Sequence, residues 1–148
     1  MTPARLDPEV VMVRLERITA LLSDLETVGE PTAERFEREP IPRFAAERIL
    51  IALVDLAVAA NSHVLAATAD VPPGDYRSSF TDLADHDVLD QALAERLAAC
   101  AGLRNVLVHL YLDIDVATVA RAAQTALADF AAYRDQLAAW LRDQQASS

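Results

Sequence analysis

A long apolar stretch that follows two prolines is the feature that most constrains the fold. Residues 43–70, RFAAERILIALVDLAVAANSHVLAATAD, come after Pro40 and Pro42 and carry apolar side chains on nearly every side of a helix. A helix that is apolar all round is buried on all sides. The pattern therefore predicts a long central helix with other helices packed around it.

The composition agrees with a helical fold. The chain has 148 residues, three glycines, 5% aromatic residues and many alanines and leucines, and these last two enter helices at little entropic cost. Hydrophobic residues make up 53% of the chain, enough to bury a sizeable core, and the length corresponds to one domain. We expect a single all-α domain over residues 1–148, an up-and-down bundle of about five helices.

Caps and apolar spacing locate the other helices. The first begins at Asp7 and Pro8, because Asp is a good N-cap and Pro fits the first helical position. Its apolar stripe consists of Val11, Leu15, Ile18, Leu22 and Leu25. Residues 70–79 break the chain, and a short third helix is expected within residues 79–87. Residues 32–40 are compatible with either a short helix or an ordered loop.

Two further helices complete the expected bundle. The fourth is expected to open at Asp87 and to run into residues 102–113, with Leu89, Leu93, Leu97 and Cys100 at core spacing. Asp115 caps the fifth, whose apolar face contains Val119, Ala123, Leu127, Phe130 and Leu137. Cys100 is the single cysteine, and its Leu-flanked position favours core packing over chemistry.

Three polar residues interrupt the apolar central helix. Asp55, Asn61 and His63 need partners there, because buried polar groups are nearly always hydrogen-bonded. A hydrogen bond to a neighbouring helix is the expected role of each, with a catalytic role as the alternative.

Charge and hydropathy exclude some functions. The net charge is −10 and all thirteen basic residues are arginines, so the surface as a whole repels nucleic acid and non-specific coating of RNA or DNA is not expected. No uncharged apolar run is long enough for a membrane span, and the first ten residues lack the apolar core of a signal peptide. We expect a cytoplasmic protein with no membrane partner.

A cluster of polar residues lies in the apolar segment GLRNVLVHLYLD. At 100° per residue, Arg104 and Tyr111 lie about 20° apart on one face of a helix, and Asn105 and His109 share another face at i and i+4. Arg104 and His109 diverge by about 140° on a straight helix. The pattern therefore predicts two polar faces.

Three arrangements would bring Arg104 and His109 together. They are a helix distortion near Gly102, the flexible arginine side chain, and a symmetry-related copy of the same helix. A two-fold homodimer is the simplest, because two arginines and two histidines would then line one positively charged groove.

Such a groove suits RNA cleavage without a metal. The reaction needs a group that moves a proton at the 2′-hydroxyl or the leaving 5′-oxygen, and a cation that stabilises charge on the phosphorane-like transition state. His109 and Arg104 match those roles, and Asn105 could orient the imidazole or bind the phosphate. A purely structural role for the cluster is the alternative.

No cofactor or metal is expected. His86 with Asp85 and Asp87 is the nearest set of metal ligands, but carboxylates at a helix start are more commonly caps.

The segment LRNVLVHLYLDID resembles the signature of HepT-like proteins, a branch of the HEPN helical superfamily. The signature is Arg, a polar residue, three others, His, one other and Tyr, and Arg104, Asn105, His109 and Tyr111 match it. The resemblance covers residues 43–142.

The resemblance implies a homodimeric HEPN-type bundle that acts as an RNase toxin. Arg104 and His109 would be the catalytic pair, and a minimal nucleotidyltransferase antitoxin would neutralise the toxin by adding AMP to Tyr111. Arg43, Arg48 and Arg96 are available for an RNA-binding patch. The alternatives are a non-catalytic helical module that binds a nucleotidyltransferase partner and nucleotide, and a plain structural dimer.

Overall fold

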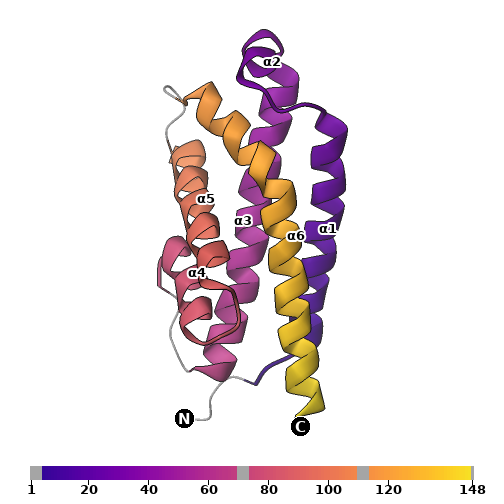
Figure 1. The fold of residues 1–148 in the computed structure, drawn as a ribbon, viewed down its shortest axis with the longest axis vertical. Coiled ribbons are helices and arrows are strands. Elements are labelled where there is room, and N and C mark those ends of the chain that lie inside the picture. The colour runs from indigo at the N-terminus through magenta and orange to yellow at the C-terminus, as the bar shows by residue number, and fades with distance from the viewer. Residues whose placement is uncertain (1–4, 70–73, 110–113, 148) are drawn as a thin grey trace.

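The computed structural model describes residues 5–69, 74–109 and 114–147, and every regular element within these ranges is an α-helix. The helices are α1 (Pro8–Val28), α2 (Ala33–Arg38), α3 (Pro40–Thr68), α4 (Tyr76–Asp85), α5 (Gln91–His109) and α6 (Val116–Ala146). Figure 1 shows that α1, α3, α5 and α6 run alternately up and down, that α2 closes the upper end and that α4 lies beside α5. The prediction of an all-α up-and-down bundle is confirmed.

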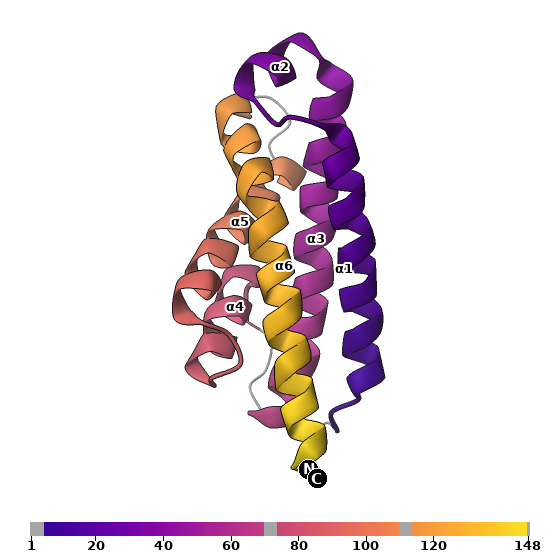
Figure 2. The ribbon, with the colours of Figure 1, turned by 45° about the vertical axis from the view of Figure 1, so that its right-hand side comes forward.

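Helix α3 is the central element, as its sequence predicts. It contacts each of the other five helices, and Figure 2 shows it behind α6 with α1 alongside. By length and mean hydropathy alone α3 could cross a membrane, but such helices are also found at the centre of soluble bundles. In this structure its apolar surface packs against the other helices.

The predicted start and apolar face of α1 are confirmed. Asp7 Oδ1 accepts a hydrogen bond of 3.0 Å from the Glu9 amide, and Pro8 is the first helical residue. All five stripe residues are buried. Asp115 likewise caps α6, accepting from the Ala117 amide at 3.1 Å.

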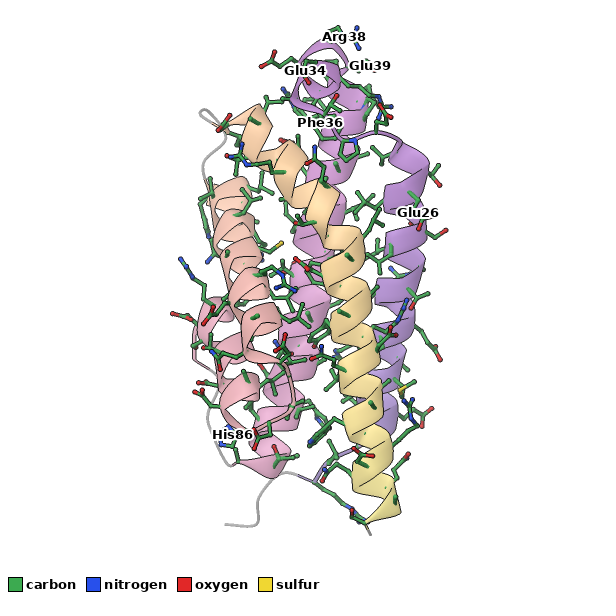
Figure 3. All side chains as sticks on the ribbon, in the orientation of Figure 1. Glu26, Glu34, Phe36, Arg38, Glu39 and His86 are labelled. Carbon is green, nitrogen blue, oxygen red and sulfur yellow. The ribbon has the colours of Figure 1, made fainter. Side chains whose placement is uncertain are left out.

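The segment whose structure the sequence left open contains the short helix α2, which raises the number of described helices to six. Thr32 caps it by accepting a hydrogen bond of 3.1 Å from the Arg35 amide. Phe36 is fully buried, and its side chain lies below α2, toward the other helices (Figure 3). Burial of this ring explains why a six-residue segment is helical, because short helices depend on packing.

The predicted boundaries of the third and fourth helices were wrong. Helix α4 begins at Tyr76, earlier than expected, because Asp75 caps it. Asp87 does not cap α5: it has a φ of 61° in the turn that ends α4, where the Val88 amide bonds back to the Leu83 carbonyl at 2.9 Å. Asp90 takes the capping role, accepting from the Leu93 amide at 3.2 Å.

The polar residues of α3 have the partners that burial requires. Asn61 is fully buried, donates to Ser79 Oγ at 3.0 Å and accepts from Tyr133 Oη at 2.6 Å. His63 Nε2 accepts from the Asp7 amide at 2.9 Å. The predicted hydrogen bond to a neighbouring helix is confirmed for Asn61, and for Asp55 as described below, whereas the partner of His63 is the amide of the residue that caps α1.

Candidate active site

Arg104 lies in a cradle made by three helices. Its Nε donates to Asp55 Oδ1 of α3 at 2.8 Å, and its guanidinium carbon lies 4.6 Å from the centre of the Tyr76 ring of α4. The side chain of Arg104 is 17% exposed, whereas that of Asp55 is 39% exposed. An arginine that is both ion-paired and stacked on an aromatic ring has a fixed guanidinium plane. We call Asp55, Tyr76 and Arg104 the arginine cradle.

The first turn of α4 is anchored to the core, and this positions the Tyr76 ring. Ser79 Oγ donates to the Tyr76 carbonyl at 2.9 Å and accepts from Asn61, which is itself bonded to the fully buried Tyr133. Hydrogen bonds from Ser78 lower the pKa of the Asp75 carboxyl, so the cap of this turn is charged at neutral pH. The cradle thus rests on a buried hydrogen-bond network.

Asn105 is hydrogen-bonded to Arg104, and no hydrogen bond joins it to His109. Arg104 Nη1 donates to Asn105 Oδ1 at 3.3 Å. His109 is the last residue of α5, is exposed, and forms no hydrogen bond or ion pair with another described residue. Within one chain, therefore, the structure brings Arg104 and Asn105 together and leaves His109 apart.

The helix that carries the motif is continuous. Residues 91–109 form one α-helix through Gly102, so a helix break there does not bring Arg104 and His109 together. Gly102 lies beside the Arg77 side chain of α4, and a Cβ at this position would lie 3.3 Å from its Nη1. Tyr111 lies outside the described residues.

Sequence reasoning missed the partners of Arg104. Asp55 was recognisable as a polar exception on an apolar helix, but nothing in the sequence connects it to Arg104, which lies 49 positions away. Nothing in the sequence marked Tyr76 as a functional residue, because it lies in the segment that was expected to form a break between two helices.

The three arginines expected to supplement the motif line different cavities. Arg96 is bound to Asp129 of α6 at 3.1 Å and lines a cavity between α5 and α6. Arg43 and Arg48 of α3 line another cavity, of about 470 Å³, together with Leu107 of α5. Only this second pair therefore adjoins the segment between Arg104 and His109.

His86 and Cys100 do not have the surroundings of a metal ligand or a nucleophile. His86 lies at the lower end of the molecule, away from α2, and its Nδ1 is 2.9 Å from the Asp82 carbonyl oxygen (Figure 3). Among the residues that the structure describes, no group of three or more His, Cys, Asp or Glu side chains could hold a metal ion. Burial, reinforced by the nearby Asp129, raises the pKa of Cys100 to about 12, so its thiol is not a nucleophile at neutral pH.

Comparison with solved structures identifies the fold. The HEPN toxin of Shewanella oneidensis, solved in a tri-AMPylated form in complex with an MNT antitoxin, superposes with a TM-score of 0.79 at 22% identity, over 88% of this chain and 97% of the toxin. YutE of Bacillus subtilis, described as a cytosolic protein of unknown function, superposes with a TM-score of 0.78 at 20% identity, over 97% of this chain and 95% of YutE. The fold is that of the HEPN toxins.

Sequence comparison then gives the family. The family model described as Ribonuclease HepT-like matches residues 14–137. The tRNA nuclease HepT of Aphanizomenon flos-aquae is 28% identical over 136 residues, which are 92% of each chain. The mRNA nuclease HepT of Shewanella oneidensis is 36% identical over 67 residues, 45% of this chain and 50% of that protein. The chain belongs to the HepT-like ribonuclease family, which confirms the resemblance seen in its motif.

Proposed function

We propose that the protein is a metal-independent endoribonuclease that acts in the cytoplasm as a homodimeric toxin and is neutralised by a nucleotidyltransferase antitoxin. Family membership supports the nuclease, as do relatives that are named as tRNA and mRNA nucleases. Similarity to a HEPN toxin in complex with an MNT antitoxin supports the partner. The observation that carries the proposal is the largely buried, oriented guanidinium of Arg104 on the helix that ends at His109.

Arg104 stabilises the negative charge that develops on the non-bridging oxygens of the phosphorane-like transition state. The contacts to Asp55 and Asn105 use two of its five N–H groups, and the others can donate to non-bridging phosphate oxygens. A guanidinium held in place before the substrate binds needs no reorganisation during the reaction. Asn105 supports this role by accepting a hydrogen bond from Arg104.

His109 transfers the protons. In the homodimer, neutral His109 of one protomer takes the proton from the 2′-hydroxyl, whose oxygen bonds to phosphorus. The bond from phosphorus to the 5′-oxygen breaks, its electron pair goes to that oxygen, and the protonated His109 of the partner subunit donates a proton to it. The products are a 2′,3′-cyclic phosphate and a 5′-hydroxyl, and neither a metal nor another cofactor takes part.

Cleavage assays test this mechanism directly. Arg104→Ala and His109→Ala should each abolish cleavage of RNA, with helix content by circular dichroism and dimer mass by light scattering unchanged. Wild type should remain active in EDTA and should leave 5′-hydroxyl ends that a polynucleotide kinase can label. Loss of cleavage in EDTA, or a monomer at micromolar concentration, would contradict the proposal.

AMP addition to Tyr111 is the proposed means of control. Phosphate charge and bulk beside Arg104 would block RNA, since both residues are expected on one face of the motif helix. A nucleotidyltransferase partner with ATP and magnesium should add mass in steps of roughly 329 Da to wild type and to Tyr76→Phe, but not to Tyr111→Phe, and the modified wild type should lose cleavage. Tyr111→Phe itself should stay active. Equal AMP addition to wild type and Tyr111→Phe would move the acceptor elsewhere.

The contact between Arg104 and Asp55 favours a second candidate, a non-catalytic module that binds a nucleotidyltransferase partner and nucleotide. An arginine already paired at 2.8 Å can have a purely structural role. Expression separates the two functions. A ribonuclease should arrest growth, and His109→Ala should relieve the arrest, whereas a docking module should be harmless and still bind its partner.

A further inference from the structure

A cavity at the upper end of the bundle adjoins the motif helix. We call it the α3 cavity; its volume is about 470 Å³, within the range of ligand sites. Its lining residues are Arg43, Phe44, Glu47, Arg48, Ile51, Leu107, Ile114 and Val116. We propose that the α3 cavity binds one nucleotide of single-stranded RNA, with the base stacked on Phe44 and the phosphate held by Arg48 and Arg43. The inference rests on the proposed ribonuclease function and adds a substrate subsite to it.

The position of the cavity suits a substrate that reaches the proposed active site. Leu107 forms part of its wall and lies on α5 between Arg104 and His109. The start of α3, the end of α5 and the start of α6 lie at the same end of the molecule (Figure 1). A strand bound at Arg104 and His109 can therefore continue into the α3 cavity.

Phe44 provides a stacking surface. Phe44 is 52% exposed, although a large aromatic residue is normally buried. The apolar side chains of Ile51, Leu107 and Val116 line the same cavity. Single-stranded RNA is recognised mainly by stacking of unpaired bases on aromatic rings and guanidinium planes.

Two arginines next to this ring are only weakly engaged by the protein. The guanidinium carbon of Arg43 lies 4.8 Å from the centre of the Phe44 ring, and its Nε lies 3.9 Å from Glu47, at the outer limit of an ion pair. The Arg43 Nε is buried and has no hydrogen-bond partner among the residues that the structure describes, which is costly for a charged donor. Arg48 is exposed and forms no hydrogen bond or ion pair within the described ranges.

Charge favours RNA over a protein as the occupant. With a net charge of −10 the chain can hold phosphate only where arginines gather locally, and Arg43 and Arg48 do so beside an exposed ring. Partial burial of the Glu47 carboxyl raises its pKa, against the opposing effect of Arg43. That carboxyl can accept a hydrogen bond from the N–H groups of a base, while the phosphate lies toward Arg48.

Binding to a non-cleaving protein tests the subsite. The full-length His109→Ala protein is titrated into a fluorescein-labelled single-stranded RNA, and the anisotropy gives Kd. Adding Phe44→Leu should weaken binding at least about fivefold, because one stacked base is lost, whereas Phe44→Trp should retain it. Adding Arg48→Ala should weaken binding and lower the slope of log Kd against log salt by about 0.7.

Arg142→Ala is the matched control. Arg142 is an exposed arginine in the last turns of α6, at the opposite end of the bundle from α2, and its removal should leave the affinity and the salt slope nearly unchanged (Figure 1). The proposal is overturned if Phe44→Leu and Arg48→Ala bind RNA like this control. It is also overturned if light scattering shows that Phe44→Leu converts a dimer to a monomer. The α3 cavity would then be the contact surface for a second copy of the chain.

The same experiment separates this inference from the proposed function. RNA cleavage is measured with the protein that retains His109. Suppose that this protein cleaves no RNA, but RNA binding by the His109→Ala protein still depends on Phe44. The ribonuclease proposal then fails and the subsite stands. If cleavage occurs and binding is indifferent to Phe44 and Arg48, the subsite fails alone.

Discussion

Replacing Asp55 by Ala removes the carboxylate that accepts a 2.8 Å hydrogen bond from Arg104. Hydrogen bonds between charged groups contribute about 1.5–3 kcal/mol when buried, whereas exposed ion pairs contribute about 0–1 kcal/mol. The Arg104 side chain is 17% exposed and that of Asp55 is 39% exposed, so the pair lies between these limits. We expect a coupling free energy of about 1–2 kcal/mol between the two side chains.

A double-mutant cycle measures this coupling. Urea unfolding and thermal unfolding are each compared for wild type, Asp55→Ala, Arg104→Ala and the double variant, all at one protein concentration because oligomers gain stability by mass action. Asp55→Ala should lower Tm by about 2–8 °C, since each kcal/mol corresponds to about 2–4 °C in a domain of this size. Asp55→Asn keeps an acceptor oxygen without the charge and should fall between wild type and Asp55→Ala.

Cleavage by the same variants gives a second readout. If Asp55 positions Arg104 for catalysis, kcat should fall in Asp55→Ala and recover in part in Asp55→Asn, with KM for RNA less affected. A coupling below about 0.3 kcal/mol, within the error of additivity, would show that the arginine cradle does not hold Arg104 and would refute the reasoning.

Three other predictions concern buried groups. Tyr133→Phe removes the 2.6 Å hydrogen bond to the buried Asn61 and should lower the free energy of unfolding by about 1–3 kcal/mol in urea; a change near zero would contradict this. Cys100 should resist thiol reagents in the native state. A pKa near 12 in place of 9 lowers the thiolate fraction at pH 8 about a thousandfold. Rapid labelling of the native protein would contradict this, because it would show that the thiol is accessible and reactive. Burial raises the pKa of Glu47 above its ordinary 4.5, so folding binds a proton there and stability is lost as pH rises through the folded-state pKa. Glu47→Gln should therefore gain stability relative to wild type as pH rises above 4.5, and the opposite trend in urea unfolding would mean that the pair with Arg43 dominates.

The sequence by itself determined the helical class, the central helix and two of the helix starts. These features depend on local chemistry: Asp7 and Asp115 accept from amides two positions ahead, and the buried stripe of α1 follows the helical period. The motif from Arg104 to Tyr111 also sufficed to indicate the family, because a signature lies in contiguous residues.

Tertiary structure decided the features that depend on distant residues. Helix α2 forms where Phe36 finds a buried position, and α5 begins at Gln91 because the turn after α4 uses Asp87 in a left-handed conformation. Two other helices supply the residues around Arg104. Only folding of the chain brings Asp55 Oδ1 to 2.8 Å from Arg104 Nε, because the two residues are 49 positions apart in the sequence. Local propensity carries no information about such a contact, since it arises only when the apolar faces of α3, α4 and α5 pack together.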